Sequence, residues 1–278
     1  MAVTGKGART RRRIVRCAAE ILAERGVLAL NLADVVAAAN VTKGALYFHF
    51  ASKDELILGV EAEYDDDSRR MIAEIGRDPD PLRRLVLLSF ALLRRQLRTS
   101  LAKAHNRLML AGIASQVQSQ LDSPPIDWAE ACRVWLVDAD EAGLLPPGLD
   151  MTALAEVFDD CMIGTVTSHH VERRHVEPMD RLAFLWSLFL LPAMVRDDAH
   201  RAALVELVEE ERNRPANPDP FGEDAYGPAQ VPAGTADDDW SDCPGTEAGR
   251  TVGIGSSSAP GAPDGTIGDA GATGVSRV

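Results

Sequence analysis

Apolar residues recur at intervals of three to four positions through most of residues 10–212, whereas no segment shows the sustained alternation that strands need. Prolines, glycines and capping residues divide this pattern into separate helices. The helices predicted from it cover residues 10–25, 32–39, 53–75, 81–97, 105–120, 126–142, 151–170, 178–194 and 197–212, with a short helix starting at residue 43. The sequence therefore predicts an all-α protein.

The short helix that begins at Lys43 lies between two helix-start signals. Thr42 is a suitable N-cap for it, and Ser52 with Glu55 forms a capping box for the next helix. A helix of fewer than about two turns is not stable by itself in water, so a small core must hold it. Its polar side chains can then face a partner, as in a recognition helix. The expected apolar anchors are Leu46, Phe48 and Phe50.

Two further helices precede this one and complete a compact unit. Gly26 suits the C′ position after the first helix, and Asn31 can cap the second. Asn40 and Val41 make a tight turn into the short helix, so residues 10–53 are predicted to form a helix-turn-helix domain. On the residues alone, a structural three-helix unit without a ligand stays open as an alternative.

Charge is strongly divided along the chain. The formal net charge is -13, but residues 1–53 hold nine Lys and Arg against three Asp and Glu, so the remainder carries -19. Residues 1–9 are expected to form a flexible basic arm, and a run of arginines follows directly. We call residues 1–53 the head. A basic head on an acidic body suits docking on a phosphate backbone.

The composition changes again after residue 212. Residues 213–278 contain eight of the sixteen prolines and twelve of the twenty-two glycines, with three basic residues against ten acidic ones. So few large apolar groups cannot offset the entropy of folding. We expect a disordered acidic tail, and we take residues 54–212, here called the body, as a second helical domain.

Several other classes of protein are not indicated. The sequence has no apolar run long enough for a membrane span, and the basic N-terminus lacks the apolar region of a secretory signal. The four cysteines show no C-x-x-C spacing, which favours reduced thiols and a cytoplasmic protein. The histidines at 169, 170 and 175 match no firm metal site, and no catalytic motif stands out. We expect no metal, no cofactor and no enzymatic activity.

Residues 10–56 resemble the DNA-binding domain of the tetracycline-repressor (TetR) family. The resemblance is carried by the stretch from Val41 to Phe50, which reads VTKGALYFHF, together with Ser52 and Lys53. It implies a dimer that binds double-stranded operator DNA, with Gly44 allowing close approach and Lys53 meeting phosphate at a helix N-terminus. The implied DNA-binding residues are Arg9, Arg11, Arg12, Arg13, Thr42, Lys43, Gly44, Tyr47, His49 and Lys53.

Within that family, the segment TKGALYFHF is most similar to the corresponding segment of the γ-butyrolactone autoregulator receptors. Trp128, which follows a Pro-Pro breaker, and Thr165 in the segment MIGTV support this resemblance, which implies that both residues line a ligand pocket. Tyr64 stands where that subfamily often has Gln. The ligand could therefore be a butyrolactone, a butenolide, a furan or an antibiotic-pathway intermediate.

Trp128, Cys132 and Trp135 share one helix face at positions i, i+4 and i+7. Such a stripe is usual for core packing, but an indole also offers apolar area with one N–H donor for a lactone or hydroxyl oxygen. We therefore expect Trp128 in the pocket. Cys132, Trp135 and Phe158 fit either the pocket or the core.

These features together predict a homodimeric repressor that a small amphiphilic signal releases from DNA. Two helices per protomer, near 151–170 and 178–194, are expected to form a four-helix bundle at the dimer interface. Ligand in the body would tilt the helix that starts at Lys53 and spoil the spacing of the recognition helices. Two alternatives stay open: a pseudo-receptor that answers to antibiotics or intermediates, and a small-molecule binding protein without operator function.

Overall fold

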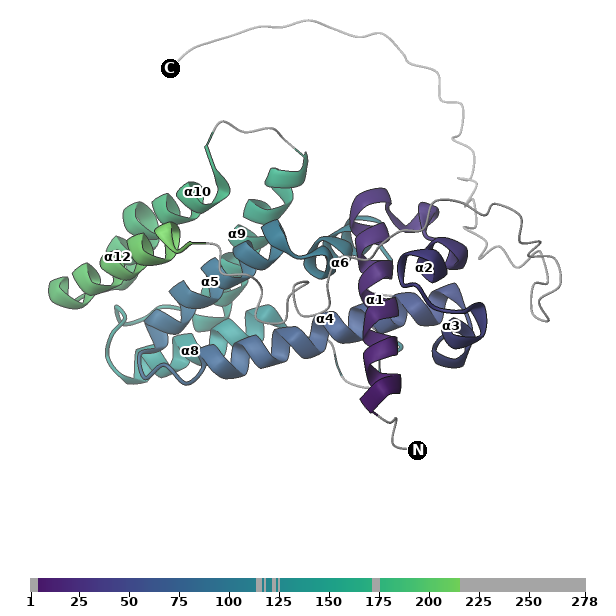
Figure 1. The fold of residues 1–278 in the computed structure, drawn as a ribbon. Helices are drawn as coiled ribbons and strands as arrows, with labels where there is room; N and C mark the ends of the chain where they lie inside the picture. Colours follow the sequence, from purple (N-terminus) through teal and green to yellow (C-terminus); the bar gives the residue numbers. More distant parts are fainter. Residues whose placement is uncertain are drawn as a thin grey trace, which may run out of the picture. The chain divides into compact units, whose positions relative to one another are not determined.

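The computed structural model describes residues 5–113, 117, 119–121, 124, 126–171 and 176–215. These residues belong to one compact unit, Met1–Pro232, and the predicted acidic tail lies outside the described residues from 216 onward. All regular elements among the described residues are helical, which confirms the predicted all-α fold (Figure 1).

The head consists of three α-helices and one 3₁₀ turn, followed by the long helix α4. Their bounds are α1 Gly5–Arg25, η1 Val27–Ala29, α2 Leu32–Ala38, α3 Lys43–His49 and α4 Lys53–Ile75. The predicted bounds of α4 are confirmed. The start of α1 was predicted too late: it is helical from Gly5, so part of the expected flexible arm, including Arg9, is helical, as is the run Arg11 to Arg13. Arg, Lys and Ala are good helix formers, which accounts for the extension.

The body contains the remaining helices, which follow the predicted order with shifts at several ends. Their bounds are α5 Pro81–Arg98, α6 Ser100–Leu110, α8 Trp128–Glu141, α9 Met151–Val171, α10 Pro178–Phe184, η2 Leu185–Leu190, α11 Leu191–Met194 and α12 Asp198–Asn213. The largest shift is at α6, which was predicted to start at residue 105. Thr99 caps it earlier, because its hydroxyl accepts from the Ala102 N–H at 3.2 Å, and Gly112 lies beyond its end with φ +69°.

The segment predicted as a single helix over residues 178–194 is interrupted by a π-helical turn, η2. Pro192 explains the interruption, because it lacks an N–H and its ring crowds the carbonyl four residues earlier. A wider turn before the proline relieves this conflict. Trp186, within this turn, is buried, and its indole N–H donates to the Ser89 hydroxyl at 2.8 Å.

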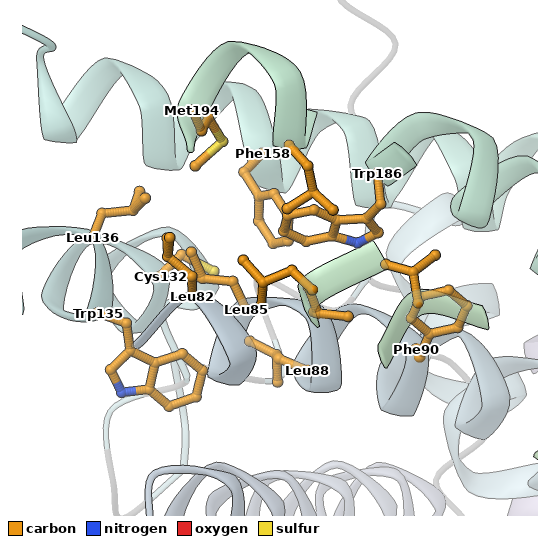
Figure 2. Packing of buried hydrophobic residues seen from close by; sticks show 14 of the residues in the cluster. Leu82, Leu85, Leu88, Phe90, Cys132, Trp135, Leu136, Phe158, Trp186 and Met194 are labelled. Carbon is orange, nitrogen blue, oxygen red and sulfur yellow. The ribbon is translucent and has the colours of Figure 1, made fainter. Parts of the chain in front are cut away.

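Two apolar cores hold the described chain together. The body core is formed mainly by α5, α8, α9, α10 and α12, and Figure 2 shows Leu82, Leu85, Phe158 and Trp186 packed within it. The head core joins α1, α2 and α3 to the first half of α4 and to α6. Helix α4 contributes Leu56 and Val60 to the head core, while Ile72 packs against the body core. The helices α4 and α6 therefore connect the two domains physically.

Candidate functional site

The recognition helix α3 is held by few side chains. Thr42 caps it as predicted, with its hydroxyl accepting from the Ala45 N–H at 3.1 Å. Leu46 and Phe50 are fully buried in the head core, as expected of anchors. Phe48 was predicted to be a third anchor, and this prediction is wrong: its side chain is 80 % exposed. On a helix of this length, the residue between two anchors points outward.

The exposed side of α3 carries residues suited to a DNA groove. Gly44 is exposed, and a Cβ added there would meet nothing within 4 Å, so no contact within the described chain requires glycine. Tyr47 is half-buried and packs against the head core. His49 lies edge-on to Phe48 with ring centroids 5.1 Å apart. Burial and the nearby charge of Arg11 lower the pKa of His49, which favours its neutral form.

Arginines of α1 divide into two groups. Arg9, Arg12 and Arg13 are exposed and remain available for phosphate. Arg11 instead lies over the Phe50 ring, with its guanidinium carbon 5.0 Å from the ring centroid. Gly59 on α4 makes room for this packing, since a Cβ there would lie 2.6 Å from a Phe50 ring atom. Arg11 thus joins α1 to the junction between α3 and α4.

The junction that starts α4 is tightly bonded. Ser52 caps the helix by accepting from the Glu55 N–H at 3.1 Å, and Glu55 accepts from the Ala51 N–H at 2.6 Å, which confirms the predicted capping box. The Lys53 ammonium donates to the Val27 carbonyl at 2.8 Å, and burial lowers its pKa. The structure therefore gives Lys53 a contact with η1 that the sequence did not suggest.

The body contains a cavity of about 700 Å³. Its wall comes from α4, α5, α6 and α9 and from the segment around Pro124 to Trp128. Two of the predicted pocket residues, Tyr64 and Trp128, line it. This volume lies within the range of about 300–1,000 Å³ that is usual for small-molecule sites.

A stack of rings and charges forms one part of the cavity wall. The Tyr64 and His105 rings are parallel within 8° with centroids 3.8 Å apart, and the Arg95 guanidinium carbon lies 4.8 Å from the Tyr64 centroid. His105 Nδ1 lies 2.9 Å from Glu61 Oε2, and both residues are buried. Burial raises the pKa of the Tyr64 phenol to about 12. The phenol therefore stays protonated and can act as a neutral hydrogen-bonding group.

The other predicted pocket residues do not line the cavity. Thr165 donates its hydroxyl to the Cys161 carbonyl at 2.8 Å, so a local bond satisfies the donor that was expected to need a ligand. The rest are part of the body core: Cys132, Trp135 and Phe158. Burial is the main reason that the pKa of the Cys132 thiol rises to about 12.

Sequence reasoning missed the polar residues of the wall other than Tyr64, among them Arg95, His105, Asn106, Asp127 and Asp159. The sequence contains one weak signal of them, because His105 and Asn106 interrupt an apolar helix. In the structure these two side chains are only 7 % and 6 % exposed. Nothing in the spacing of residues could place them beside Tyr64, which is distant along the chain.

Helix α6 belongs to both functional parts of the protein. Ala104 and Leu108 lie in the head core, whereas His105 and Asn106 line the cavity on the neighbouring face. Helix α1 packs extensively on α6. Helix α6 therefore contacts both the cavity and α1, which carries the exposed arginines.

The sequence also led us to expect neither a metal site nor a membrane-spanning helix. The described residues contain no group of three or more His, Cys, Asp and Glu side chains that could hold a metal ion, and the weighed cluster at His169, His170, Glu172 and His175 lies outside those whose side chains are described. In the described part of the chain, no helix has the length and apolar character needed to cross a membrane.

A helix-turn-helix head with exposed arginines, joined through two shared helices to a ligand-sized cavity, is the arrangement of a DNA-binding regulator that has a small-molecule site. Comparison with known proteins agrees. Residues 14–60 match the family described as "Bacterial regulatory proteins, tetR family".

Two curated relatives are similar over much of the described chain. The A-factor receptor protein of Streptomyces griseus is 27 % identical over 218 residues, which cover 76 % of this chain and 72 % of the relative. The HTH-type transcriptional regulator TtgR of Pseudomonas putida is 30 % identical over 148 residues, which cover 51 % of this chain and 70 % of the relative.

Solved structures give the same assignment. A γ-butyrolactone receptor (ArpA-like protein) has a TM-score of 0.62 and 28 % identity, covering 74 % of this chain and 98 % of the other. The TetR-family protein CprB of Streptomyces coelicolor, in complex with its biological operator sequence, has a TM-score of 0.61 and 28 % identity, covering 75 % and 99 %. The chain belongs to the TetR family of transcriptional regulators. Within that family it is similar to the γ-butyrolactone receptors.

Proposed function

We propose that this protein is a homodimeric, cytoplasmic repressor that releases its operator DNA when a small amphiphilic molecule fills the cavity. The observation that carries this proposal is the double role of α6, whose adjacent faces form the head core and the cavity wall. A ligand that binds one position of α6 better than another changes the affinity of the head for DNA by linkage.

The DNA-facing residues support the first part of the proposal. Helix α3 would enter a major groove with Lys43, Gly44 and Tyr47, and Thr42 and His49 flank them. The exposed arginines of α1 would contact phosphate, and Arg11 and Lys53 would position α3 and the start of α4 from behind. CprB, whose structure is similar, was solved bound to its operator.

An exposed apolar stripe supports the dimer. Val157 on α9 is 55 % exposed, and Phe184, Leu188 and Phe189 on α10 and η2 are 57, 60 and 66 % exposed. Several large apolar side chains exposed on consecutive helices are typical of an interface. A second copy would cover it as a four-helix bundle and set two recognition helices to face successive major grooves, about 34–36 Å apart or at a related spacing.

An electrophoretic gel shift on the DNA upstream of the coding sequence tests operator binding. Specific, salt-dependent retardation is expected, because arginine contacts to phosphate release counterions. Absence of retardation would contradict the proposal and favour a small-molecule binding protein without operator function.

The cavity is tested in the same assay with organic extract of the culture as the source of the signal. Extract is expected to release DNA from the wild type but not from Trp128→Ala, which should keep its DNA affinity because Trp128 lies in the body. Val134→Ala serves as the control, because Val134 is an exposed residue of α8 that does not line the cavity. If extract releases DNA from Trp128→Ala as it does from the wild type, Trp128 does not belong to the ligand site. Release by the host's antibiotics or intermediates, but not by butyrolactones, would identify a pseudo-receptor.

A further inference from the structure

Two carboxylates of the cavity wall have no compensating cation. Asp159 is half-buried on α9, and Asp127 precedes the first turn of α8. Asp127 caps that helix through one oxygen, which accepts from the Glu130 N–H at 2.9 Å. Burial raises the pKa of Asp159, and the negative charges of Asp160 and Asp127 raise it further. No ion pair among the described residues includes Asp127 or Asp159.

Each of the other charged groups of the wall lies near an oppositely charged side chain, although the Nε and Nη2 atoms of Arg95 are buried without a hydrogen-bond partner. These pairs are Asp65 with Arg69 at 3.1 Å, Arg95 with Asp67 at 3.0 Å, and His105 with Glu61 at 2.9 Å. Asp127 and Asp159 are therefore the charged groups of the wall that have no oppositely charged neighbour among the described residues, and their charge is negative. Asp127 is exposed, but Asp159 is half-buried, and its charge therefore acts more strongly than in water. It opposes an anionic ligand and favours a cationic one.

Asn106 provides an independent indication that the cavity takes a polar ligand. Its side chain lines the cavity and is 6 % exposed. The described residues offer its amide no hydrogen-bond partner, although buried amides are normally paired. A ligand with a hydrogen-bonding group would satisfy it.

The rest of the wall is largely apolar. Trp128, Met162, Ile163 and Val166 supply hydrocarbon and aromatic surface beside the polar groups. We propose that the natural effector is an amphiphile with a protonated amine, which Asp159 and the free oxygen of Asp127 hold while its apolar part packs against α9 and Trp128. This inference rests on the proposed function, because it takes the cavity to be the effector site.

Isothermal titration calorimetry on the full-length protein tests the proposal with three probes of equal chain length: decylamine, 1-decanol and decanoate. Each is used below the concentration at which it forms micelles. The variants are Asp159→Asn and Asp127→Asn, which preserve size, and asparagine also preserves the cap at position 127. Asp160→Asn is the matched control, because it removes the same charge from an exposed neighbour on α9.

The wild type is expected to bind decylamine more tightly than 1-decanol and to reject decanoate. Asp159→Asn should weaken decylamine binding by about tenfold or more, which corresponds to a lost charge-assisted hydrogen bond, and should leave 1-decanol binding unchanged. Asp127→Asn should weaken decylamine binding in the same direction. Unchanged 1-decanol binding also shows that each variant is folded.

Three outcomes would overturn the proposal: equal affinity of the wild type for the three probes, decylamine binding that survives Asp159→Asn, or an equal loss in Asp160→Asn. The gel shift without any amine separates this failure from failure of the proposed function. Specific operator binding by a protein that does not prefer decylamine would refute the proposed ligand class but would still support the proposed repressor function.

Discussion

At the scale of single residues, the head shows how sharply exposure differs between neighbours in one short helix. Leu46 and Phe50 are fully buried, while Phe48, between them, is exposed. The sequence presents all three as apolar anchors, because a helix of this length is too short to show a clear apolar periodicity. Only the surrounding core decides which side chains face inward.

Alanine variants of this pair give a prediction for stability. Leu46→Ala is expected to lower the free energy of unfolding by about 2–5 kcal/mol, since it leaves a cavity in the head core. Phe48→Ala should change it by less than about 0.5 kcal/mol, because its ring is solvent-exposed. Urea denaturation measures both. Equal losses in the two variants would contradict the assignment of Phe48 to the surface.

The buried phenol of Tyr64 gives a prediction for pH dependence. Its pKa of about 12 in the folded protein exceeds the value of about 10 in an unfolded chain. The folded state therefore retains the proton more strongly, and this stabilisation is complete below pH 10 and is lost as the pH rises through 12.

Between pH 9 and 11, this group should reduce the stability of the wild type by about 1 kcal/mol relative to Tyr64→Phe. Urea denaturation of both proteins at the two pH values checks this. If the difference in stability between wild type and Tyr64→Phe is the same at both pH values, Tyr64 is not shielded from solvent as the structure indicates.

At the scale of elements, two helical glycines serve different purposes. Gly44 in α3 has open space around it, whereas Gly59 in α4 lies against the Phe50 ring. The sequence does not distinguish them, since both interrupt helices made of better helix formers. The difference arises from the close packing of α4 on the junction after α3.

Alanine substitutions should separate the two glycines. Gly44→Ala is expected to keep or slightly raise the melting temperature, since alanine is favoured over glycine in a helix by about 1 kcal/mol, but to weaken operator binding. Gly59→Ala should lower the melting temperature, because its methyl group would displace Phe50. Thermal denaturation and the gel shift measure the two effects. Operator binding unchanged in Gly44→Ala would show that α3 does not approach DNA closely at this position.

At the scale of the whole molecule, the exposed apolar side chains on α9, α10 and η2 form the surface through which we propose that a second copy of the chain binds. In the proposed dimer, covering these side chains would remove a surface that promotes aggregation and would fix the distance between the two heads. Ligand and DNA would then act on the same assembly, because α4 and α6 contact both the head core and the cavity.

A charged substitution in this stripe tests the dimer. Phe189→Glu is expected to convert the protein to a monomer in analytical ultracentrifugation and to abolish operator binding, because one head contacts only one half-site. Val134→Glu is the control, since Val134 is also an exposed apolar residue but lies on α8. A dimer that survives Phe189→Glu, or a control that dissociates equally, would place the interface elsewhere.

The sequence by itself determined the helices, most of their caps and the helix-turn-helix unit, because these depend on residues close together along the chain. The capping box of Ser52 and Glu55 and the caps at Asn31 and Thr42 are local in this sense. The resemblance of the recognition stretch correctly indicated the family. Tyr64 and Trp128, singled out through the same resemblance, both line the cavity, and their contact with a ligand stays a prediction.

Only the tertiary structure decided which polar groups meet at the cavity. Helix periodicity shows which residues share a face, but not which distant helix that face contacts, so Arg95, His105, Asn106 and Asp159 could not be placed beside Tyr64. For the same reason the sequence could not show that four predicted pocket residues lie elsewhere. The Thr165 hydroxyl is satisfied by a local hydrogen bond, and the body core contains Cys132, Trp135 and Phe158. Contacts between residues far apart in the chain depend on how whole helices pack, and that information is not local.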